Sequence, residues 1–554
     1  MPKVRLALAQ TNPLVGDIEA NLDGAFAAVR AAEKSGAELV LFGEMALSGY
    51  PIEDLAARES FLVSAEQALE DFAKRLESEG LGHIAVVIGH PALAKKQVAR
   101  SWAIAQNCAS VIRGGKVIGK YAKHHLPNYS VFDEYRNFVP GQDLFTFELQ
   151  GLNFSTLICE DIWQNGGPVA QLKSSNTDIV LVLNGSPFEV DKDDKRLSLV
   201  QELAKSNQVA VAYVNLVGGQ DDLVFDGDSI LVDSSGKLVG RSKQFVEDLK
   251  LYDIASKQEI YAVAESAMTK PNDLEQIWGA LVLGLRDYVE KNNFPSVILG
   301  LSGGIDSAVC ASLATDAIGA ERVYGVAMPS KYSSEHSIAD AADSAARIGL
   351  SFSTQSIESF VTAFETELQL SGLALENLQA RMRAVILMGL SNSAGHLVLT
   401  TGNKSELAVG YSTIYGDSVG GFAPIKDIEK TLVWKLAKWR NEFATLNGQT
   451  PPIPENSISK PPSAELRPDQ LDQDSLPEYE LLDGILDAYV EQNLGRAQIV
   501  ALGFDAAVVN RIIDLVDRAE WKRRQGAIGP KITGTAFGRD RRLPITKNSK
   551  QSSN

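Results

Sequence analysis

Hydrophobic residues in the first half of the chain recur as short apolar runs of strand length, separated by stretches with helical spacing. Residues 4–9 alternate like a strand, and residues 18–34 place apolar side chains at helical intervals after Asp17, a good helix cap. Further apolar runs lie at 38–42, 84–88 and 178–183. Runs of this kind are typical of strands covered by helices, so the pattern predicts an α/β domain.

Two stretches of the first half have the pattern of a β-hairpin. In 111–121, VIRGGKVIGKY, a Gly-Gly pair separates two apolar runs, and 225–242 is a second example. Hairpins join antiparallel strands. We therefore expect a mixed sheet here and not a purely parallel one.

The strand pattern ends near residues 256–273, and a helix follows at about 274–292 with Asn272 or Asp273 as its cap. We expect the domain boundary at this point, with one domain over 1–265 and a second over 266–554.

The second half alternates strands and helices in the order typical of a parallel, doubly wound sheet. The predicted elements are strand 296–300, helix 306–318, strand 323–328, helix 335–348, a helix near 375–393 and strand 397–401. Residues 450–479 contain seven prolines and many acids. They predict a mobile surface loop, either a functional lid or a disordered insertion.

Composition narrows the functional class. The 554 residues are 45% hydrophobic and 22% charged, as in ordinary globular proteins, and the net charge of −17 argues against an extended nucleic-acid surface. The three cysteines, Cys108, Cys159 and Cys310, are too few for a disulfide framework. No apolar run has the length of a membrane span or a signal peptide. We expect a cytoplasmic protein without membrane or nucleic-acid partners.

The stretch 298–309, ILGLSGGIDSAV, predicts a phosphate-binding loop between a strand and a helix. Its glycines let backbone N–H groups point at an anion, and the helix N-terminus adds its dipole. The loop lacks the lysine of the common nucleotide loop and carries Asp306, which fits beside phosphates if it holds Mg²⁺. We expect pyrophosphate to be the leaving group. The alternative is a glycine turn that only packs the helix on the strand.

This loop resembles the pyrophosphate loop of the ATP pyrophosphatases that adenylate a carbonyl group. The segments 376–388, 399–431 and 520–544 resemble the NAD synthetase domain, so the resemblance covers nearly all of 270–544. It implies a doubly wound parallel-sheet ATP pyrophosphatase fold with ATP and deamido-NAD as substrates.

The same resemblance implies a set of site residues. ATP would be bound by Gly300, Leu301, Ser302, Gly303, Gly304, Ile305, Asp306, Ser307, Thr401 and Lys430. Deamido-NAD would be bound by Asn377, Arg381, Glu406 and Lys522, and Mg²⁺ by Asp306 and Glu406. Basic residues cluster at 522–542, and without the neighbouring motifs that cluster would be taken for a solvated tail.

Three stretches of the first half, 41–51, 121–141 and 157–164, each carry one candidate reactive group, namely Glu44, Lys123 and Cys159. A thiol needs a base to become a nucleophile and a cation to hold its thiolate, which Glu44 and Lys123 could supply. A lone cysteine at a strand end is more often a small buried hydrophobe. Cys108 and Cys310 are interpreted in that way.

Together these stretches resemble the three motifs of the nitrilase superfamily over about 1–250. The resemblance implies an αββα sandwich with a Glu–Lys–Cys amidase site, in which Glu134 supports the lysine. Tyr129, Ser186 and Lys192 match positions that contact glutamine in the glutamine-dependent NAD synthetases, where both domains are fused. Lys192 lies in the charged run 189–196 and could simply be solvated.

The fused family implies that glutamine hydrolysis through a Cys159 thioester supplies ammonia to an acyl-adenylate of deamido-NAD. The resemblance also implies that ATP is converted to AMP and pyrophosphate and that the enzyme is a homo-oligomer. Two alternatives stay open: another glutamine-fed adenylating enzyme with a different carboxylate acceptor, and a nucleotide sensor or scaffold without catalysis.

Overall fold

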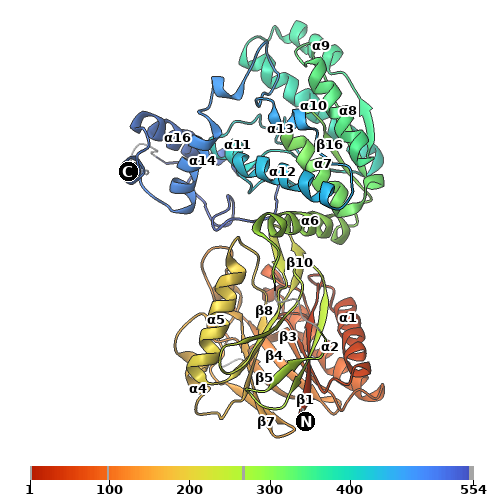
Figure 1. The fold of residues 1–554 in the computed structure, drawn as a ribbon, viewed down its shortest axis with the longest axis vertical. Coiled ribbons are helices and arrows are strands. Elements are labelled where there is room, and N and C mark those ends of the chain that lie inside the picture. Colours follow the sequence, from red (N-terminus) through yellow and green to blue (C-terminus); the bar gives the residue numbers. More distant parts are fainter. Residues whose placement is uncertain (1–2, 96–98, 101, 265–268, 548–554) are drawn as a thin grey trace. The chain divides into compact units, whose positions relative to one another are not determined.

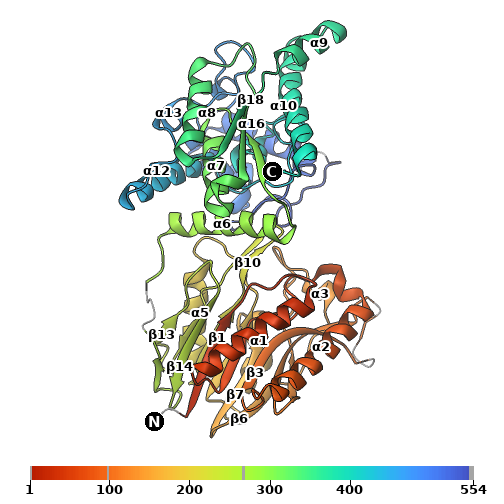
Figure 2. The same cartoon turned by 90° about the vertical axis from the view of Figure 1, so that its right-hand side faces the viewer.

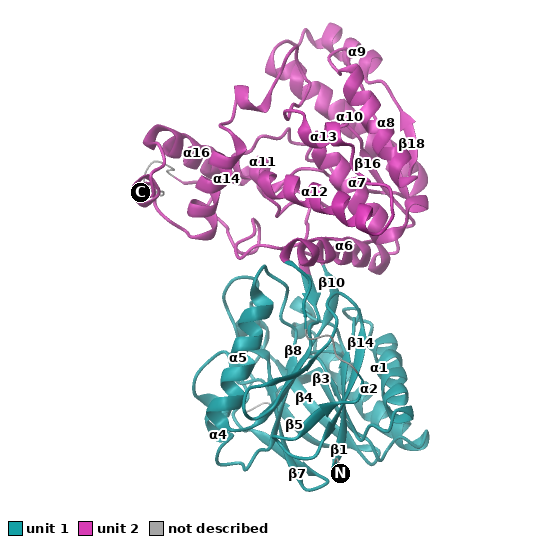
Figure 3. Ribbon diagram, in the orientation of Figure 1, with its two compact units in different colours: residues 1–220, 224–272 teal, residues 221–223, 273–554 magenta. Residues whose placement is uncertain are grey.

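The chain folds into two compact units (Figure 3). One consists of residues 1–220 and 224–272, and the other of residues 221–223 and 273–554. The computed structural model describes residues 3–95, 99–100, 102–264 and 269–547. The boundary predicted between residues 265 and 266 lies outside the described residues.

Two mixed β-sheets form the centre of the first unit. Within the described residues one sheet contains, in spatial order, β15 (Ile260–Ala262), β14 (Asp248–Ile254), β1 (Val4–Gln10), β2 (Leu39–Phe42), β3 (Ala85–Leu93), β4 (Ala105–Arg113) and β5 (Lys116–Ala122). The other contains β13 (Leu238–Arg241), β12 (Ile230–Val232), β9 (Ala210–Asn215), β8 (Ile179–Asn184), β7 (Leu152–Ile158) and β6 (Phe145–Leu149). Strands β10 (Val217–Gln220) and β11 (Leu223–Asp226) pair separately.

Alternating side chains of the strands build two layers of core. In β2, Leu39 and Leu41 join the cluster between the sheets, whereas Val40 and Phe42 join a cluster under α1 (Ile18–Lys34) and α2 (Glu59–Ser78). Successive strand side chains point to opposite faces, so one short apolar run serves both layers. Figure 2 shows α1 and α2 over the same sheet, and Figure 1 shows α5 (Lys192–Asn207) covering the other.

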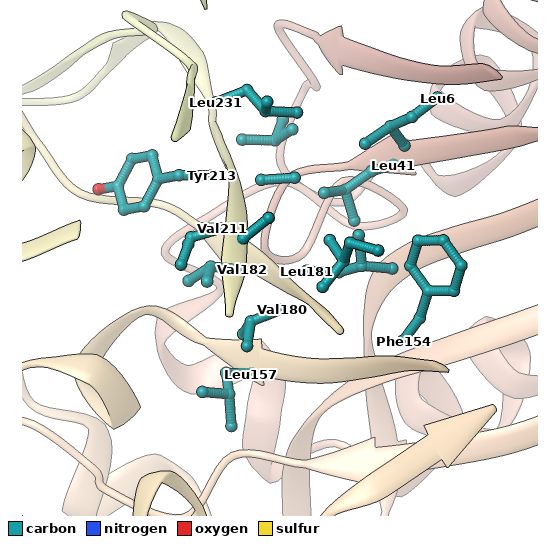
Figure 4. Packing of buried hydrophobic residues seen from close by; sticks show 14 of the residues in the cluster. Leu6, Leu41, Phe154, Leu157, Val180, Leu181, Val182, Val211, Tyr213 and Leu231 are labelled. Carbon is teal, nitrogen blue, oxygen red and sulfur yellow. The ribbon is translucent and has the colours of Figure 1, made fainter. Parts of the chain in front are cut away.

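Leu6 and Leu41 of one sheet and Leu157 and Leu181 of the other belong to the same buried cluster (Figure 4). The expected αββα sandwich is thereby confirmed. The hairpins β4–β5 and β12–β13 are antiparallel as predicted. Asp17 caps α1 by accepting a hydrogen bond of 3.1 Å from the Ala20 amide, also as predicted.

The second unit is built around a parallel sheet, which confirms the doubly wound pattern. Within the described residues its strands, in spatial order, are β18 (Ser351–Thr354), β17 (Val323–Ala327), β16 (Val297–Gly300) and β19 (Leu397–Val398). The helices that accompany them are α6 (Asp273–Lys291), α7 (Ile305–Ile318), α8 (Glu335–Ile348), α9 (Glu358–Leu368) and α10 (Leu373–Ala394). Strand β19 is shorter than the predicted strand 397–401, and beyond it Leu399 forms an isolated bridge with Phe422.

A helical region with its own core follows in the same unit. Its helices are α11 (Lys404–Val409), α12 (Lys430–Leu446), α13 (Glu455–Ser459), α14 (Tyr479–Leu486), α15 (Arg496–Ala501), α16 (Ala506–Arg518) and α17 (Glu520–Arg523). In the described part of the chain no helix is both long and apolar enough to cross a membrane.

The segment 450–479 is not the plain surface loop that its composition predicts. It contains α13, and Ile453 and Ser457 are buried. The Ser457 hydroxyl donates a hydrogen bond of 2.9 Å to the Gly303 carbonyl, and Glu465 accepts hydrogen bonds from the side chains of Ser334 and Ser337. Prolines favour extended backbone, but these few anchored side chains attach the segment to the parallel-sheet core.

We predict that Leu181→Ala lowers the free energy of unfolding of the first unit by about 2–5 kcal/mol, because it leaves a cavity between the sheets. Val63→Ala on α2 is the matched control, since Val63 is half-exposed, and it should change stability by no more than about 0.5 kcal/mol. Thermal unfolding followed by circular dichroism measures both. Equal shifts for the two variants would contradict the sandwich core.

Candidate active sites

Glu44 lies just beyond the end of β2 and is completely buried. Its Oε1 accepts hydrogen bonds from Lys123 Nζ at 2.8 Å and from Asn107 Nδ2 at 2.6 Å. Its Oε2 accepts one of 2.8 Å from the Gly185 amide, at the end of β8. Both oxygens are therefore oriented by groups from β4 and from the residues just after β5 and β8, and Asn107 is a partner that sequence reasoning missed.

Lys123, at the end of β5, is buried between two carboxylates. Its Nζ lies 2.8 Å from Glu44 Oε1 and 2.8 Å from Glu134 Oε2. Burial alone would lower the pKa of Lys123, but Glu134 and Glu44 outweigh it and raise that pKa well above the ordinary value. The side chain is therefore an ammonium at neutral pH.

Glu134 begins the short helix α3 (Glu134–Asn137). Burial and then Glu44 raise its pKa to about 7, against the opposing effect of Lys123. The Tyr50 hydroxyl donates a hydrogen bond of 2.8 Å to Glu134 Oε1 and keeps the carboxylate in place. The structure thus places Glu134 in direct contact with Lys123.

Cys159 is the first residue after β7 and begins the 3₁₀ turn Cys159–Ile162. Its φ of +43° is a left-handed backbone conformation that non-glycine residues rarely adopt. Burial, followed by Glu44, raises the pKa of the thiol well above its usual value, and Lys123 opposes both. The resting side chain is therefore a thiol with an acid and an ammonium beside it.

Asp161 joins the cysteine turn to the lysine segment, and sequence reasoning missed it. One carboxylate oxygen accepts hydrogen bonds of 3.0 and 2.9 Å from the amides of His124 and His125. The other accepts bonds of 3.0 Å from the Ile158 amide and 2.6 Å from the Tyr121 hydroxyl. Asp161 thus links the backbone just after Lys123 to the strand end that carries Cys159.

The three positions expected to bind glutamine differ in their surroundings. Tyr129 is exposed, and its hydroxyl donates a hydrogen bond of 2.8 Å to Glu160, the neighbour of Cys159. Ser186 follows the amide that binds Glu44. Lys192 begins α5 and pairs with Glu189 at 3.2 Å, a contact that does not tie it to the thiol.

A buried arginine fixes the backbone at Ser186. Arg196 of α5 donates hydrogen bonds of 3.0 and 2.9 Å to the carbonyls of Ser186 and Pro187. It also forms a buried ion pair with Asp226 at 2.7 Å. The charged run 189–196, for which solvation is the alternative to glutamine binding, thus includes a buried cation at Arg196.

The glycine loop of the second unit connects β16 to α7. Gly303 has a φ of +77°, and a Cβ there would lie 2.2 Å from the Ser337 carbonyl oxygen. The Ser302 hydroxyl accepts a hydrogen bond of 3.2 Å from the Gly304 amide, and the Ser307 hydroxyl donates one of 2.9 Å to the Gly304 carbonyl. The predicted loop residues, from Gly300 through Leu301 and Ile305 to Ser307, therefore form one tight turn at a helix N-terminus.

Asp306, Glu406 and Lys430 meet beside this loop. The Lys430 ammonium contacts Asp306 and lies 3.7 Å from Glu406 Oε1, and Asn403 donates a hydrogen bond of 3.0 Å to Asp306. Burial and then Asp306 raise the pKa of Glu406 to about 8, with Lys430 opposing. Asp306 and Glu406 thus share the single ammonium of Lys430, and this excess of acidic groups favours binding of an additional cation. No cluster of three metal-ligating side chains occurs among the described residues.

Three positions expected to bind the dinucleotide contact one segment, residues 410–414. Asn377 Oδ1 accepts a hydrogen bond of 2.8 Å from the Thr413 hydroxyl, and Arg381 Nε donates one of 3.3 Å to the Ile414 carbonyl. Lys522 donates bonds of 2.8 Å to the carbonyls of Gly410 and Ser412. The fourth position, Glu406, lines a cavity of about 30 Å³ with other side chains.

Thr401 lies on the segment that leaves the end of β19, and it is partly buried. Its neighbours Thr400 and Gly402 line the same cavity as Glu406. Thr401 itself does not line that cavity.

Comparisons with known proteins cover both units. A family model of carbon-nitrogen hydrolases matches residues 5–262, and one of NAD synthases matches residues 277–526. A protein of Acinetobacter baylyi named glutamine-dependent NAD(+) synthetase is 45% identical over 98% of each chain. One of the same name from Thermotoga maritima is 41% identical over the whole of both chains.

Two solved structures match the full chain. The glutamine-dependent NAD+ synthetase of Acinetobacter baumannii, in complex with adenosine diphosphate, is 45% identical with a TM-score of 0.78 over 98% of each chain. A glutamine-dependent NAD(+) synthetase of Cytophaga hutchinsonii is 21% identical with a TM-score of 0.82 over 99% of this chain and 98% of its own, and it supports the fold alone.

We predict that Gly303→Ala destabilises the second unit by more than about 1 kcal/mol, because an alanine is strained at this φ and its methyl group would meet the Ser337 carbonyl. Gly389→Ala in the middle of α10 is the control. A Cβ there meets nothing within 4 Å, and replacing a helical glycine should stabilise by about 0.5–1 kcal/mol. Thermal unfolding compares them, and a stabilised Gly303 variant would be inconsistent with this loop geometry.

Proposed function

The chain belongs to the family of glutamine-dependent NAD(+) synthetases, and we propose that it converts deamido-NAD to NAD with ATP as the energy source and glutamine as the nitrogen donor. The products are NAD, glutamate, AMP and pyrophosphate. One observation carries the proposal: the same chain holds a buried Cys–Lys–Glu cluster in one unit and a glycine loop beside Asp306, Glu406 and Lys430 in the other.

The first half-reaction releases ammonia in the amidase unit. The Cys159 sulfur attacks the side-chain amide carbon of glutamine as its proton passes to Glu44. The Lys123 ammonium stabilises the oxyanion, and ammonia leaves with the proton from Glu44. Water, deprotonated by Glu44, then hydrolyses the thioester to glutamate. Glu134 keeps Lys123 protonated throughout, which agrees with the raised pKa of Lys123.

Glutamine would be oriented by side chains around this cluster. Tyr129 is exposed beside Glu160 and can reach an incoming ligand. Ser186 lies on a backbone segment held by Arg196. Lys192, which stands at the start of α5, would pair with the carboxylate of glutamine once it leaves Glu189.

The second half-reaction forms an acyl-adenylate. The nicotinate carboxylate of deamido-NAD attacks the α-phosphorus of ATP, and pyrophosphate leaves into the turn of Ser302, Gly303 and Gly304. Backbone N–H groups at the start of α7 would hold its charge. Lys430 would move from Asp306 to a phosphate oxygen, and Thr401 would contact ATP. Ammonia then attacks the acyl carbon and displaces AMP.

Mg²⁺ fits this site. It prefers one or two carboxylates together with phosphate oxygens, and Asp306 and Glu406 supply two carboxylates beside a single ammonium. When bound, the ion would neutralise charge that builds up on the leaving pyrophosphate. A bound metal ion would also lower the pKa of Glu406.

The dinucleotide would be held by Asn377, Arg381, Glu406 and Lys522. Three of these already contact residues 410–414, so one ordered segment sets their spacing. We place the enzyme in the cytoplasm, since the three cysteines are free and buried and thus suit a reducing compartment.

The deciding experiment measures NAD formation from deamido-NAD, ATP and Mg²⁺ with either glutamine or ammonium as the nitrogen source. NAD with both sources, together with one AMP and one pyrophosphate per NAD, supports the proposal. Release of glutamate without NAD would reject deamido-NAD as the acceptor. ATP binding without pyrophosphate release would reject catalysis by the second unit.

We predict that Cys159→Ala lowers the glutamine-dependent rate by about a thousand-fold or more, because the nucleophile is lost. The ammonium-dependent rate should persist, since Cys159 belongs to the first unit. Cys108→Ala is the control: this cysteine is equally buried, in β4, and both rates should survive its loss. Loss of both rates in folded Cys159→Ala would refute this division of labour.

We predict that Asp306→Asn lowers NAD formation by about a hundred-fold or more with glutamine and with ammonium alike, because the adenylation site loses a charge. Asp343→Asn, which breaks only the surface pair with Arg347 on α8, should leave both rates unchanged. Steady-state assays with each nitrogen source make the comparison. A loss confined to the glutamine reaction would argue against a role for Asp306 in adenylation.

A further inference from the structure

Arg383 lies on α10, the helix that also carries Asn377 and Arg381. Asn377 and Arg381 are four residues apart and therefore share one side of the helix, whereas Arg383 is rotated by roughly 200° from Arg381. Arg381 is exposed and contacts the Ile414 carbonyl. Arg383 is partly buried and contacts the parallel sheet instead.

The contact of Arg383 places it at the carboxyl edge of the sheet. Its Nε donates a hydrogen bond of 3.0 Å to the carbonyl of Met328, the residue directly after β17. Open parallel sheets bind nucleotides outside the carboxyl ends of their strands. Arg383 is therefore on the edge that carries the glycine loop, one strand away from β16.

Met328 also lies close to the start of the glycine loop. A Cβ at Gly300 would lie 3.0 Å from Cε of Met328 and 3.8 Å from Cδ1 of Leu387 on α10. The start of the glycine loop, the end of β17 and α10 thus meet in one place. α10 also packs against β16 and β19.

The Arg383 guanidinium has fewer protein partners than it has donors. Within the described residues it makes the single hydrogen bond to Met328, from Nε, and no ion pair. Burial lowers its pKa to about 10, opposed by the more distant charges of Glu465 and Asp417.

The two acids near Arg383 already have other partners. The Glu465 carboxylate accepts hydrogen bonds from Ser334 and Ser337, and Asp417 accepts one from the Thr413 amide. A partly buried cation without a close counter-ion costs free energy that a bound anion would recover. A planar guanidinium suits phosphate oxygens in particular, because it can donate two parallel hydrogen bonds.

We propose that Arg383 binds a phosphate group of a nucleotide substrate through its terminal nitrogens, while Nε stays on the Met328 carbonyl. The identity of the nucleotides rests on the proposed function, so the phosphate belongs either to ATP or to deamido-NAD. Arg383 is then a substrate-binding residue in addition to Arg381, on a different side of the same helix.

The test measures binding of ATP and of deamido-NAD separately, by isothermal titration calorimetry, to the full-length wild type, Arg383→Gln and Arg383→Lys. Glutamine can still donate to the Met328 carbonyl but carries no charge. We expect Arg383→Gln to weaken one of the two nucleotides by about ten-fold or more. Arg383→Lys should fall between it and the wild type, because it keeps the charge without the paired donors.

Arg347→Gln is the matched control. This arginine on α8 forms a surface pair with Asp343, and both affinities should stay within about two-fold of the wild type. Weaker ATP binding in Arg383→Gln assigns the phosphate to ATP, and weaker deamido-NAD binding assigns it to the dinucleotide. Unchanged affinities for both would overturn the proposal, even if the melting temperature falls, because that result indicates a purely structural arginine.

Arg383→Lys alone carries the test if the glutamine variant does not fold, with the same two titrations and the same criterion. A failure of the proposed function would look different, since the wild type itself would then bind no deamido-NAD or form no NAD.

Discussion

A buried ammonium shared by two carboxylates is the interaction on which both sites depend. Lys123 lies between Glu44 and Glu134 in one unit, and Lys430 between Asp306 and Glu406 in the other. Lys404 repeats the arrangement with Asp427 and Glu491. Each trio has one more acid than base, so deprotonation of any of the three lysines costs free energy. Removing a partner from a buried pair typically costs about 3–5 kcal/mol.

The trios can exist because strand ends bring their members together. Glu44, Lys123 and Cys159 follow β2, β5 and β7, and the Gly185 amide follows β8. Hydrophobic burial between the sheets positions those ends, and the charged groups extend from a frame that is already rigid. In the second unit the buried parallel sheet likewise positions the glycine turn after β16 and Asp306, which follows that turn.

Sequence patterns predict what depends on local spacing. The strand at 4–9, the helix capped by Asp17, the hairpin β4–β5 and the strand–helix alternation that begins at β16 follow from periodicity and turn chemistry within about twenty residues. The reactive trio Glu44, Lys123 and Cys159 follows from resemblance, since no local rule links residues that distant in sequence.

Other features could not be predicted in this way. Asp161 acts by accepting backbone amides of His124 and His125, and any acid in the chain could do so in principle. Arg383 is one of two arginines on a short stretch of helix, and only the packing of α10 tells them apart. In residues 450–479 the prolines predict irregular backbone, but the bond from Ser457 to Gly303 depends on an encounter across 154 residues.

That bond also has a consequence for biosynthesis. During translation the glycine loop leaves the ribosome well before residue 457 does, and β16 can pair with β17 as soon as both have emerged. The Gly303 carbonyl can accept its hydrogen bond from Ser457 only after residue 457 has been synthesised. A chain cut short before α13 would therefore keep its nucleotide-loop motif while lacking the brace on that turn.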